Sequence, residues 1–251
     1  MKHRLTLKIG HYLGNARDKK HLNEEMFSVI APQYDLITRL FSFWQDASWK
    51  RGLIAALPAA LPAADHPQCL DLACGTGDIC FLLANAYPNA RITGVDLTEE
   101  MLILARKVNT YSHVTFEKGD MGQLPMPDMS FDIVTGGYAL RNAPDLAQTI
   151  AEIHRVLKPG GTAAFLDFSK PQSRLAQRLE YILLKGWTGM WGLILQRNHE
   201  VYSYIAESLS LYPDRKQIQA MFIAQGFTVK MSKLHFLGIT ETLLVQKHGA
   251  A

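Results

Sequence analysis

Hydrophobic and polar positions along the chain follow two patterns, one typical of buried strands and one typical of helices. Strands are predicted at residues 68–73, 91–97, 114–119, 131–135, 162–168, 227–236 and 240–246. Helices are predicted at residues 78–87, 98–108, 145–157 and 214–225. Strands that alternate with helices build a mostly parallel sheet covered on both faces. We therefore predict an α/β fold, a Rossmann-like, doubly wound sheet of seven strands.

The two ends of the chain add to this pattern. The last two predicted strands are close enough in sequence to form an antiparallel hairpin, so we expect an antiparallel last strand. Before the first strand lies a helical region, and the Ala- and Pro-rich segment from Pro58 to Pro67 links the two. The sequence thus divides into a helical N-terminal region, residues 1–62, and a main domain, residues 63–251, with an aromatic helical insertion at about 174–210.

One short segment of the main domain contains strong breakers of regular structure. Lys158-Pro159-Gly160-Gly161 lies between a predicted helix and a predicted strand. Proline and glycine interrupt regular elements, so we expect these four residues chiefly to turn the chain.

Composition excludes several classes of protein. The 251 residues are 48% hydrophobic and 20% charged, as in ordinary globular domains. A net charge of +3 is too small to indicate nucleic acid, which needs a clustered basic surface. The chain has no apolar run of 18 residues, and its N-terminus lacks the apolar core of a signal peptide. We therefore expect a cytoplasmic protein that binds no nucleic acid.

Two segments leave a peripheral membrane contact open. Residues 1–20 hold six basic side chains against one acid, Asp18, and form either a solvated terminus or a contact with an anionic membrane surface. The apolar, aromatic stretch 181–195 is too short to span a bilayer. It is either a core helix or dimer face, or a lid over a greasy substrate that touches the membrane surface. The segment Phe41-Ser42-Phe43-Trp44 allows the same two interpretations.

The cysteines and histidines do not indicate a metal site. Cys69, Cys74 and Cys80 crowd around one turn, without C-x-x-C spacing or a neighbouring histidine. The nine histidines form no recognisable ligand pair. We expect no metal, and we expect the three thiols to be small packing residues.

The most informative segment is Leu70-Asp71-Leu72-Ala73-Cys74-Gly75-Thr76-Gly77-Asp78, in which a buried strand ends in a glycine turn. Gly75 and Gly77 let the backbone turn tightly and approach a ligand, and the N–H groups that open the next helix point into the same crevice. The turn therefore predicts a nucleotide site. A turn that serves only the fold is the alternative, because G-x-G alone is a weak signal.

The side chains of this turn favour one nucleotide over another. A dinucleotide would place its pyrophosphate beside Asp78, which would repel it, and Cys80 stands where G-x-G-x-x-G requires a small third residue. S-adenosylmethionine has no phosphate and carries an ammonium and a sulfonium, which carboxylates such as Asp71 and Asp78 attract. We therefore predict S-adenosylmethionine as the cofactor and disfavour a dehydrogenase.

Further candidate cofactor residues follow the next two strands, because ligands of doubly wound sheets bind at the carboxyl ends of the strands. Asp96, followed by Leu97, ends the second strand, where an acid accepts hydrogen bonds from both ribose hydroxyls. The alternative for Asp96 is a charge that favours the start of the next helix. Asp120 and Met121 end the third strand, where a carboxylate can bind the adenine amine and a thioether can pack on the ring.

The fourth strand runs into the segment expected to carry the chemistry, Thr135-Gly136-Gly137-Tyr138-Ala139-Leu140-Arg141-Asn142. Paired glycines at a strand end allow a ligand to come close. Arg141 and Asn142 place a guanidinium and an amide beside the expected reactive centre. The alternative for Arg141 is a bond to a neighbouring carbonyl or an ion pair with Asp145.

Together these residues resemble the ubiquinone/menaquinone biosynthesis C-methyltransferases, within the class I S-adenosylmethionine-dependent methyltransferases. The resemblance extends from Met26 to about Phe227. Besides the glycine turn, it rests on the segments 26–35 (MFSVIAPQYD), 49–51 (WKR), 138–142 (YALRN), 155–161 (RVLKPGG), 167–171 (DFSKP) and 202–208 (YSYIAES).

The resemblance implies a reaction and roles for particular residues. It implies that residues 1–62 form a substrate cap, and that residues 63–251 bind S-adenosylmethionine with the aromatic insertion as a substrate lid. It places Thr76, Asp96, Asp120, Met121 and Gly137 at cofactor positions and Tyr34, Arg141 and Asn142, the candidate catalytic residues, near the substrate. The implied reaction is C-methylation of a reduced quinone precursor, demethylmenaquinol or a 2-polyprenyl-methoxy-benzoquinol, with S-adenosylhomocysteine as the second product.

The chain departs from the family at several positions. Gly137 stands where members often have serine, and Tyr138-Ala139 replaces a Phe-Gly pair. The usual C-terminal His-Arg-Gly-Tyr-Lys run is absent. A methyltransferase that transfers to carbon or oxygen of another small aromatic metabolite therefore stays open, as does a non-catalytic S-adenosylmethionine-binding scaffold subunit. A homodimer stays open too.

The expected chemistry needs a proton acceptor and a stabilised phenolate. A neutral ring carbon is a weak nucleophile, and loss of a proton from an ortho hydroxyl moves negative charge onto that carbon. Arg141 keeps its proton, so we assign it, with Asn142, to stabilisation of the phenolate. Tyr34 would orient the ring or relay the proton through water. The sequence does not identify the group that finally accepts the proton.

Overall fold

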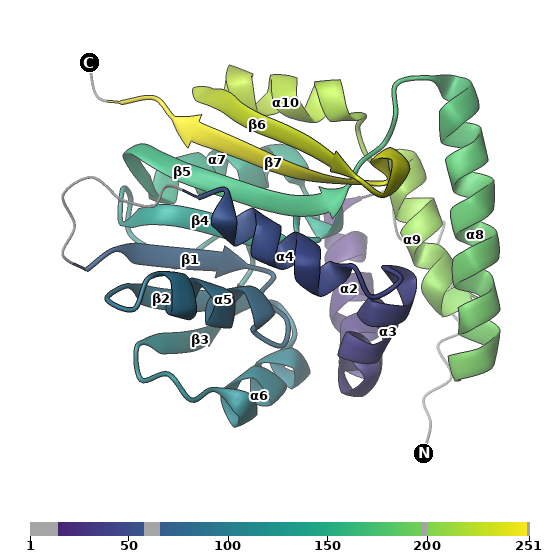
Figure 1. The fold of residues 1–251 in the computed structure, drawn as a ribbon, viewed down its shortest axis with the longest axis horizontal. Helices are drawn as coiled ribbons and strands as arrows, with labels where there is room; N and C mark the ends of the chain where they lie inside the picture. The colour runs from purple at the N-terminus through teal and green to yellow at the C-terminus, as the bar shows by residue number, and fades with distance from the viewer. Residues whose placement is uncertain (1–14, 58–65, 197–199, 250–251) are drawn as a thin grey trace.

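The computed structural model describes residues 15–57, 66–196 and 200–249. Its centre is one seven-stranded sheet with the strand order β3-β2-β1-β4-β5-β7-β6 (Figure 1). The strands are β1 (Gln68–Leu72), β2 (Arg91–Asp96), β3 (Val114–Lys118), β4 (Phe131–Gly137), β5 (Leu157–Phe168), β6 (Phe227–His235) and β7 (Thr240–Lys247). The strands β1 to β5 pair in parallel, whereas β7 is antiparallel to both β5 and β6. The predicted doubly wound sheet with an antiparallel last strand is confirmed.

Helices cover both faces of this sheet and so bury both sides of its strands. Figure 1 shows α4 (Asp46–Ala55), α5 (Asp78–Ala86) and α6 (Glu99–Val108) nearer the viewer, and α7 (Leu146–Val156) and α10 (Arg215–Ala224) on the far side. Successive residues of β1 point to opposite faces: Cys69 packs with Leu83 of α5, whereas Leu70 packs with Ile150 of α7. Each face therefore has its own hydrophobic core.

Four other helices stand together beyond the carboxyl ends of the parallel strands (Figure 1). They are α2 (Ala16–Ile30), α3 (Tyr34–Phe41), α8 (Arg174–Gln196) and α9 (Glu200–Leu211). The aromatic insertion is thus a pair of helices, held side by side by Glu207, which accepts hydrogen bonds from Tyr181 at 2.7 Å and Lys185 at 2.9 Å. This cluster lies where the site is expected.

The start of β5 contradicts the predicted turn at residues 158–161. Strand β5 begins at Leu157, directly after α7, and includes Lys158 through Gly161. Leu157 pairs with Phe131, and after a register shift Thr162 pairs with Ile133, so the extra residues form an irregularity within the sheet. Gly160 has a φ of +76°, which glycine adopts at little cost. The prediction was wrong because the breakers bend the strand without ending it.

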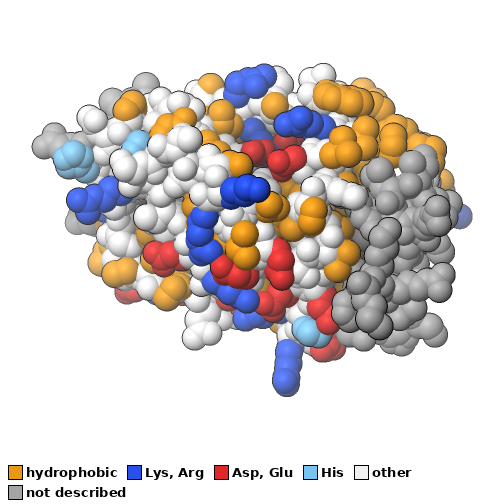
Figure 2. Space-filling model, turned by 90° about the horizontal axis from the view of Figure 1, so that it is seen from below, with side chains coloured by type: hydrophobic (Ala, Val, Ile, Leu, Met, Phe, Trp, Pro, Cys, Tyr) orange, Lys and Arg blue, Asp and Glu red, His pale blue; other side chains and the backbone are white. Residues whose placement is uncertain are grey.

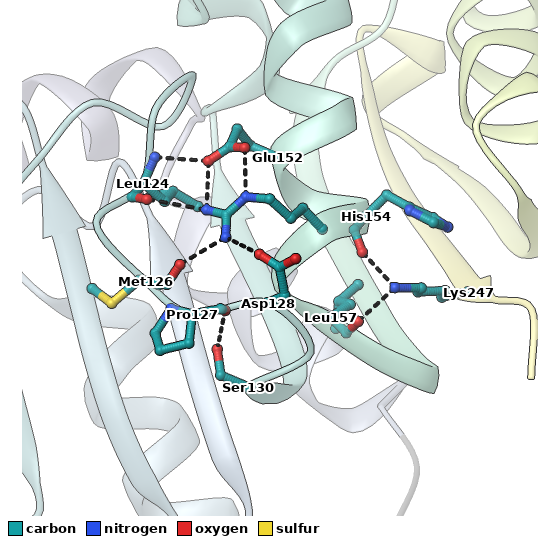
Figure 3. A network of polar contacts seen from close by, with 10 residues as sticks. Leu124, Met126, Pro127, Asp128, Ser130, Glu152, His154, Leu157 and Lys247 are labelled. Carbon is teal, nitrogen blue, oxygen red and sulfur yellow. Dashed lines mark hydrogen bonds and ion pairs between the residues drawn. The ribbon is translucent and has the colours of Figure 1, made fainter. Parts of the chain in front are cut away.

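Arg155, the first residue of the segment RVLKPGG, fixes the loop that follows β3. Its guanidinium donates to the carbonyls of Met126 and Leu124 and to the carboxylates of Asp128 and Glu152 (Figure 3). These charge-assisted bonds connect α7 to a loop more than 25 positions away. The same loop carries Asp120 and Met121 at its start, so Arg155 supports the predicted cofactor residues from outside the site.

Candidate functional site

A pocket opens where the carboxyl ends of the central parallel strands meet. Its lining comes from the turn after β1 (Ala73, Gly75), the end of β2 (Asp96, Leu97), the segment after β3 (Gly119, Asp120, Met121), the end of β4 (Gly137, Tyr138, Asn142) and the N-terminal helices (Asn23, Phe27, Tyr34). The strand order changes direction between β1 and β4, which is where doubly wound folds bind ligands.

The glycine turn has the backbone geometry expected of a ligand cradle. Gly77 has a φ of +91° and begins α5, and Gly75 has a φ of +53°. A Cβ on Gly77 would lie 2.9 Å from ring atoms of Phe116 and Phe81, so position 77 accepts only glycine without rearrangement. The amide of Gly75 donates to Asp96 Oδ2 at 2.8 Å, which ties the turn to the end of β2.

Asp96 lies in the pocket wall, and both of its carboxylate oxygens accept hydrogen bonds. Oδ2 accepts from the Gly75 amide and Oδ1 from the Thr98 amide, each at 2.8 Å. Burial raises the pKa of Asp96, and hydrogen bonds from Gly75, Leu97 and Thr98 oppose that shift. A ligand hydroxyl that binds Asp96 would share its oxygens with these donors.

Asp120 and Met121 also line the pocket, next to each other after β3. Asp120 accepts from the Gly122 amide at 2.8 Å and pairs with the ammonium of Lys20 at 2.7 Å. Lys20, which the sequence left as part of a basic terminus, thus lies at the predicted adenine position. An amine that binds Asp120 has to share this carboxylate with Lys20 or displace it.

Three predicted cofactor residues do not line the pocket. Asp71 lies beneath the turn, where it accepts from Thr135 Oγ1 at 2.8 Å and from Cys80 Sγ at 3.4 Å. Thr76 donates to Asp35 at 2.9 Å, and Gly77 packs against aromatic rings. These residues support the shape of the turn in this structure, whereas Gly75, Asp96, Leu97, Asp120, Met121 and Gly137 line the pocket.

Two of the three candidate catalytic residues line the pocket, and the third does not. Tyr34 and Asn142 line the pocket. Burial is the largest cause that raises the pKa of Tyr34 to about 12, with Lys50 opposing it. Asn142 donates to the Tyr138 carbonyl at 2.7 Å and accepts from Tyr204 at 3.2 Å, which fixes its amide.

Arg141 lies behind this wall. Its guanidinium carbon is 5.0 Å from the centre of the Phe168 ring and 5.6 Å from that of Tyr204, and Nη1 donates to Ser208. The Nε atom is buried and has no hydrogen-bond partner in the described part of the chain. A buried, unsatisfied donor is costly, so an acceptor atom brought to Nε would bind favourably.

Helix α2 closes the pocket through polar residues that the sequence analysis did not single out. Lys19 donates to the carbonyls of Arg141 and Ala143 at 2.9 Å and 2.6 Å, and Asn23 donates to the carbonyl of Asn142 at 2.7 Å. Burial, with Arg141 nearby, lowers the pKa of Lys19 to about 8. A polar residue on the buried face of an amphipathic helix is the signal that could have indicated Asn23.

A second polar cluster connects α4 to the turn. The buried ammonium of Lys50 lies 2.7 Å from Asp46 and 3.0 Å from Asp78, and Asp46 accepts a 2.7 Å hydrogen bond from the Tyr138 hydroxyl. Asp78, expected to attract a cationic ligand, is therefore already paired. No role for Asp46 or Lys50 could be predicted from the sequence, because Asp78 lies 28 positions from Lys50 and Tyr138 lies 92 positions from Asp46.

The described residues contain no group of three or more His, Cys, Asp or Glu side chains placed to hold a metal. Cys69, Cys74 and Cys80 are buried free thiols, and burial raises the pKa of each. Within the same ranges, no helix is both long and apolar enough to cross a bilayer.

The donor set of the pocket suits S-adenosylmethionine. Asp96 and Asp120 offer carboxylate oxygens, and Leu97, Met101 and Met121 offer apolar surface for an adenine ring. A Cβ on Gly137 would lie 2.8 Å from Ile79, so glycine at this position avoids a close contact with Ile79. Fold and pocket together define a class I methyltransferase that uses S-adenosylmethionine.

Comparison with known proteins gives the family. The profile of the ubiE/COQ5 methyltransferase family matches residues 15–245, and the chain belongs to this family. A demethylmenaquinone methyltransferase of Deinococcus radiodurans is 35% identical over 89% of this chain and 92% of its own length. A 2-phytyl-1,4-naphtoquinone methyltransferase of Synechococcus elongatus is 36% identical over 81% of this chain and 88% of its own. An S-adenosylmethionine-dependent methyltransferase from Mesorhizobium loti shares the fold, with a TM-score of 0.59 at 20% identity over 80% of this chain and 98% of that one.

The environment of Asp71 predicts a pH dependence of stability. Burial raises the pKa of Asp71 from 3.8 to about 7, so the folded protein binds this proton more tightly than the unfolded chain does. Its contribution to stability is therefore complete below about pH 4 and is lost as the pH rises through about 7. Asp71→Asn has no charge to bury, so between pH 5 and pH 8 its free energy of unfolding should fall less than that of the wild type, by roughly 2–3 kcal/mol.

Urea unfolding at several pH values between 5 and 8 measures this difference. Glu117→Gln is the control, because Glu117 is exposed on β3 and its replacement should leave the pH dependence of the wild type unchanged. Parallel curves for Asp71→Asn and the wild type would contradict the expected role of burial.

Proposed function

We propose that this enzyme methylates a ring carbon of a reduced quinone precursor, either demethylmenaquinol or a 2-polyprenyl-methoxy-benzoquinol, and releases S-adenosylhomocysteine. The observation that carries the proposal is the set of neutral polar residues in the pocket lining. Tyr34, Tyr138 and Asn142 line the pocket with Phe27, whose ring lies 6.1 Å from that of Tyr34. Hydroxyl and amide groups next to an aromatic wall fit a ring that bears hydroxyls. The names of the relatives from Deinococcus radiodurans and Synechococcus elongatus point to the same class of acceptor.

The two ends of the pocket would hold different parts of the reaction. Asp96 would accept the ribose hydroxyls, Asp120 the adenine amine, and Leu97 and Met121 would pack on the adenine. The turn with Gly75, Thr76 and Gly77, supported by Asp71, and the floor at Gly137 would border the remainder of the cofactor. When bound, the cofactor supplies an electrophilic methyl group. The acceptor ring would then lie toward Tyr34 and Asn142.

This chain's contribution to the chemistry would be to make the ring carbon nucleophilic. Tyr34 and Asn142 would orient the ring hydroxyls, and the fixed amide of Asn142 costs little reorganisation. Arg141, which lies behind the pocket wall, would stabilise the phenolate through the charge of its buried guanidinium. The field of a buried guanidinium acts strongly over a few ångströms, because little water screens it.

The helices around the pocket would act as a cap and a lid. The N-terminal region, residues 1–62, would cover the ring through α2, and the α8–α9 pair would cover a polyprenyl tail. Several large hydrophobic side chains of α8 are exposed, among them Leu175, Leu179, Ile182 and Leu183. In the view of Figure 2, hydrophobic side chains gather toward the side on which α8 lies in Figure 1, whereas basic and acidic side chains are interspersed over the middle of the face.

The same proposal includes a peripheral contact with the inner face of the cytoplasmic membrane, where a polyprenylated acceptor would partition. An apolar corner formed by Phe43, Trp44, Phe236 and Leu237 supports it. The ring of Phe43 stacks on that of Phe236 at 5.2 Å, and Leu237 is fully exposed. The segments that carry the corner also bear exposed Arg39 and Lys233, which would attract anionic headgroups.

A second candidate function is methyl transfer to another small phenolic metabolite. The geometry at Gly137 favours keeping it, because the serine that members of the family often carry there would meet Ile79. A pocket floor without that hydroxyl and with Tyr138 beside it offers different donors to a ring. A scaffold subunit without turnover is the third candidate.

Methyl transfer distinguishes these candidates. We expect the protein to transfer labelled methyl groups from S-adenosylmethionine to a reduced short-tailed demethylmenaquinol or to a methoxy-benzoquinol, with the product mass increase located on a ring carbon. Methylation on oxygen, or only of other phenols, would favour the second candidate. Tight cofactor binding with no transfer to any phenol would favour the scaffold.

The assignment of Arg141 predicts a loss of turnover with little loss of cofactor affinity. Arg141→Ala removes a charged donor, and loss of one such electrostatic stabiliser costs roughly 3–4 kcal/mol of transition-state free energy. We expect turnover below about a tenth of wild type, while S-adenosylmethionine affinity, measured by calorimetry, changes less than about threefold because Arg141 does not line the pocket. Arg141→Lys, which keeps the charge, should recover part of the rate. A folded, cofactor-bound Arg141→Ala enzyme with more than a tenth of the turnover would contradict this role.

The apolar corner predicts binding to lipid. The full chain should float with vesicles that contain anionic lipid, and Leu237→Ser combined with Trp44→Ser should abolish flotation, because these side chains are the most exposed of the corner. Ile103→Ser is the control, since Ile103 is a comparably exposed residue on α6. If the double variant floats as well as the Ile103→Ser control does, or if the wild type does not float, this contact is excluded. A change of oligomeric state in Leu237→Ser, measured by sedimentation, would assign the corner to a dimer instead.

A further inference from the structure

The proposed reaction needs a group that accepts the hydroxyl proton of the substrate. C-methylation of a phenol requires a group that removes the hydroxyl proton, and Arg141 cannot accept one. Among the described residues, the acids that line the pocket are Asp96 and Asp120. Asp96, at the end of β2, already accepts from two backbone amides, and Asp120, after β3, is paired with Lys20. Both are the predicted adenosine-binding residues.

Tyr138 connects the pocket to a third carboxylate. It is among the residues that line the pocket, and its hydroxyl donates a 2.7 Å hydrogen bond to Asp46 Oδ1. Asp46 itself does not line the pocket and is buried at the start of α4. A proton that reaches the Tyr138 oxygen therefore has a direct path to a carboxylate.

Asp46 is held in one orientation. Lys50, one turn later on α4, lies 2.7 Å from Asp46 Oδ2, which leaves Oδ1 for Tyr138. The Asp46 amide donates to Ser42 Oγ at 3.1 Å, so the residue is also fixed through its backbone. A buried ion pair adds little net stability to a fold, because desolvation of both charges offsets their attraction. Its placement against a pocket tyrosine is therefore informative about function.

We propose that Tyr138 and Asp46 form the proton-accepting pair of the active site, an inference that rests on the proposed methylation of a phenolic ring. Tyr138 is the catalytic residue, because its hydroxyl contacts the ring hydroxyl of the acceptor. Asp46 acts through Tyr138, and Lys50 positions Asp46.

The protons and electrons balance over the two halves of the reaction. First the acceptor O–H bond breaks, its proton passes to the Tyr138 oxygen, and the Tyr138 proton passes to Asp46, which leaves the negative charge on the ring. The ring carbon then forms a bond to the methyl group, and the electron pair of the broken carbon–sulfur bond stays on sulfur. Loss of the ring C–H proton to water restores aromaticity, and the proton on Asp46 returns through Tyr138 to the ring oxygen. One proton is released for each methyl group transferred.

The charged and titratable surroundings of Tyr138 support an oxygen that relays protons without holding the negative charge. Burial is the largest cause that raises the pKa of Tyr138 well above its usual range, and Asp46 adds to it. Tyr34 on α3 and Asp167 on β5 act in the same direction. Two further charged groups lie near Asp46: Lys50 of α4 pairs with Asp46, and Asp78 of α5 pairs with Lys50. A tyrosine with this pKa gives up its proton only as it receives another, so the two transfers are concerted.

The test compares two acceptors whose hydroxyls differ in acidity. One is a reduced short-tailed quinol, which is neutral at pH 7, and the other is an electron-poor phenol of similar size that is already ionised at pH 7. Tyr138→Phe should slow kcat for the neutral quinol about 100-fold, within the usual range for general base catalysis, and change kcat for the ionised phenol less than about threefold. Asp46→Asn should show the same selectivity. Tyr111→Phe, which removes a hydrogen-bonded hydroxyl from the surface, is the matched control and should change neither rate.

The outcomes that overturn the proposal are specific. Equal slowing of both acceptors by Tyr138→Phe would reduce Tyr138 to a role in pocket shape, and no slowing of either would remove it from the reaction. The kcat of Tyr138→Phe for the neutral quinol should rise with pH across the ionisation range of the quinol, since hydroxide in solution replaces the missing acceptor. A pH profile parallel to that of the wild type would also contradict the proposal.

A binding measurement separates this inference from the proposed function. A nitrophenol bound together with S-adenosylhomocysteine reports its own ionisation by absorbance, with no methyl transfer needed. A hydrogen bond from the nitrophenol hydroxyl to the Tyr138 oxygen should shift the pKa of the bound nitrophenol in the wild type and in Tyr111→Phe, and the shift should disappear in Tyr138→Phe. If quinols are not methylated but the shift depends on Tyr138, the proposed function fails and the inference stands. If the shift is the same in Tyr138→Phe, the inference fails, whichever acceptor the enzyme uses.

Discussion

The buried ammonium of Lys50 is the interaction on which the geometry of this site depends. It lies between two carboxylates from different helices, Asp46 of α4 and Asp78 at the start of α5. The pair with Asp46 is buried, and removal of one partner from a buried pair costs roughly 3–5 kcal/mol, whereas Asp78 is half exposed and contributes less. Lys50 therefore fixes the N-terminal helices against the glycine turn and, through Asp46, sets the orientation of the Tyr138 hydroxyl.

The succession of strands and helices along the chain and the position of the pocket could be predicted because local patterns determine them. The alternation of strands and helices, the hairpin of β6 and β7, and the turn at Gly75 and Gly77 all follow from neighbouring residues. Residues predicted at strand ends, such as Asp96 and Asp120, reach the pocket because parallel strands bring their carboxyl ends to one edge. The positions of these residues are a property of the topology.

Contacts across long stretches of sequence could not be predicted. Asn23 contacts Asn142, and Asp46 contacts Tyr138, over separations of 119 and 92 positions. The breakers in the segment RVLKPGG suggested a turn because the sequence does not reveal that β4 pairs with Leu157. Arg141 illustrates the same point, since its neighbours Phe168, Tyr204 and Ser208 come from elements that fold against it from later in the chain.

The ion pair between Lys20 and Asp120 gives helix α2 a second property besides coverage of the pocket. Both side chains are partly exposed, so dissolved salt screens their attraction. A cofactor amine that binds Asp120 would compete with Lys20 for the carboxylate. Added salt weakens the ion pair and would therefore make Asp120 more accessible to an uncharged amine, the opposite of its effect on a purely electrostatic contact.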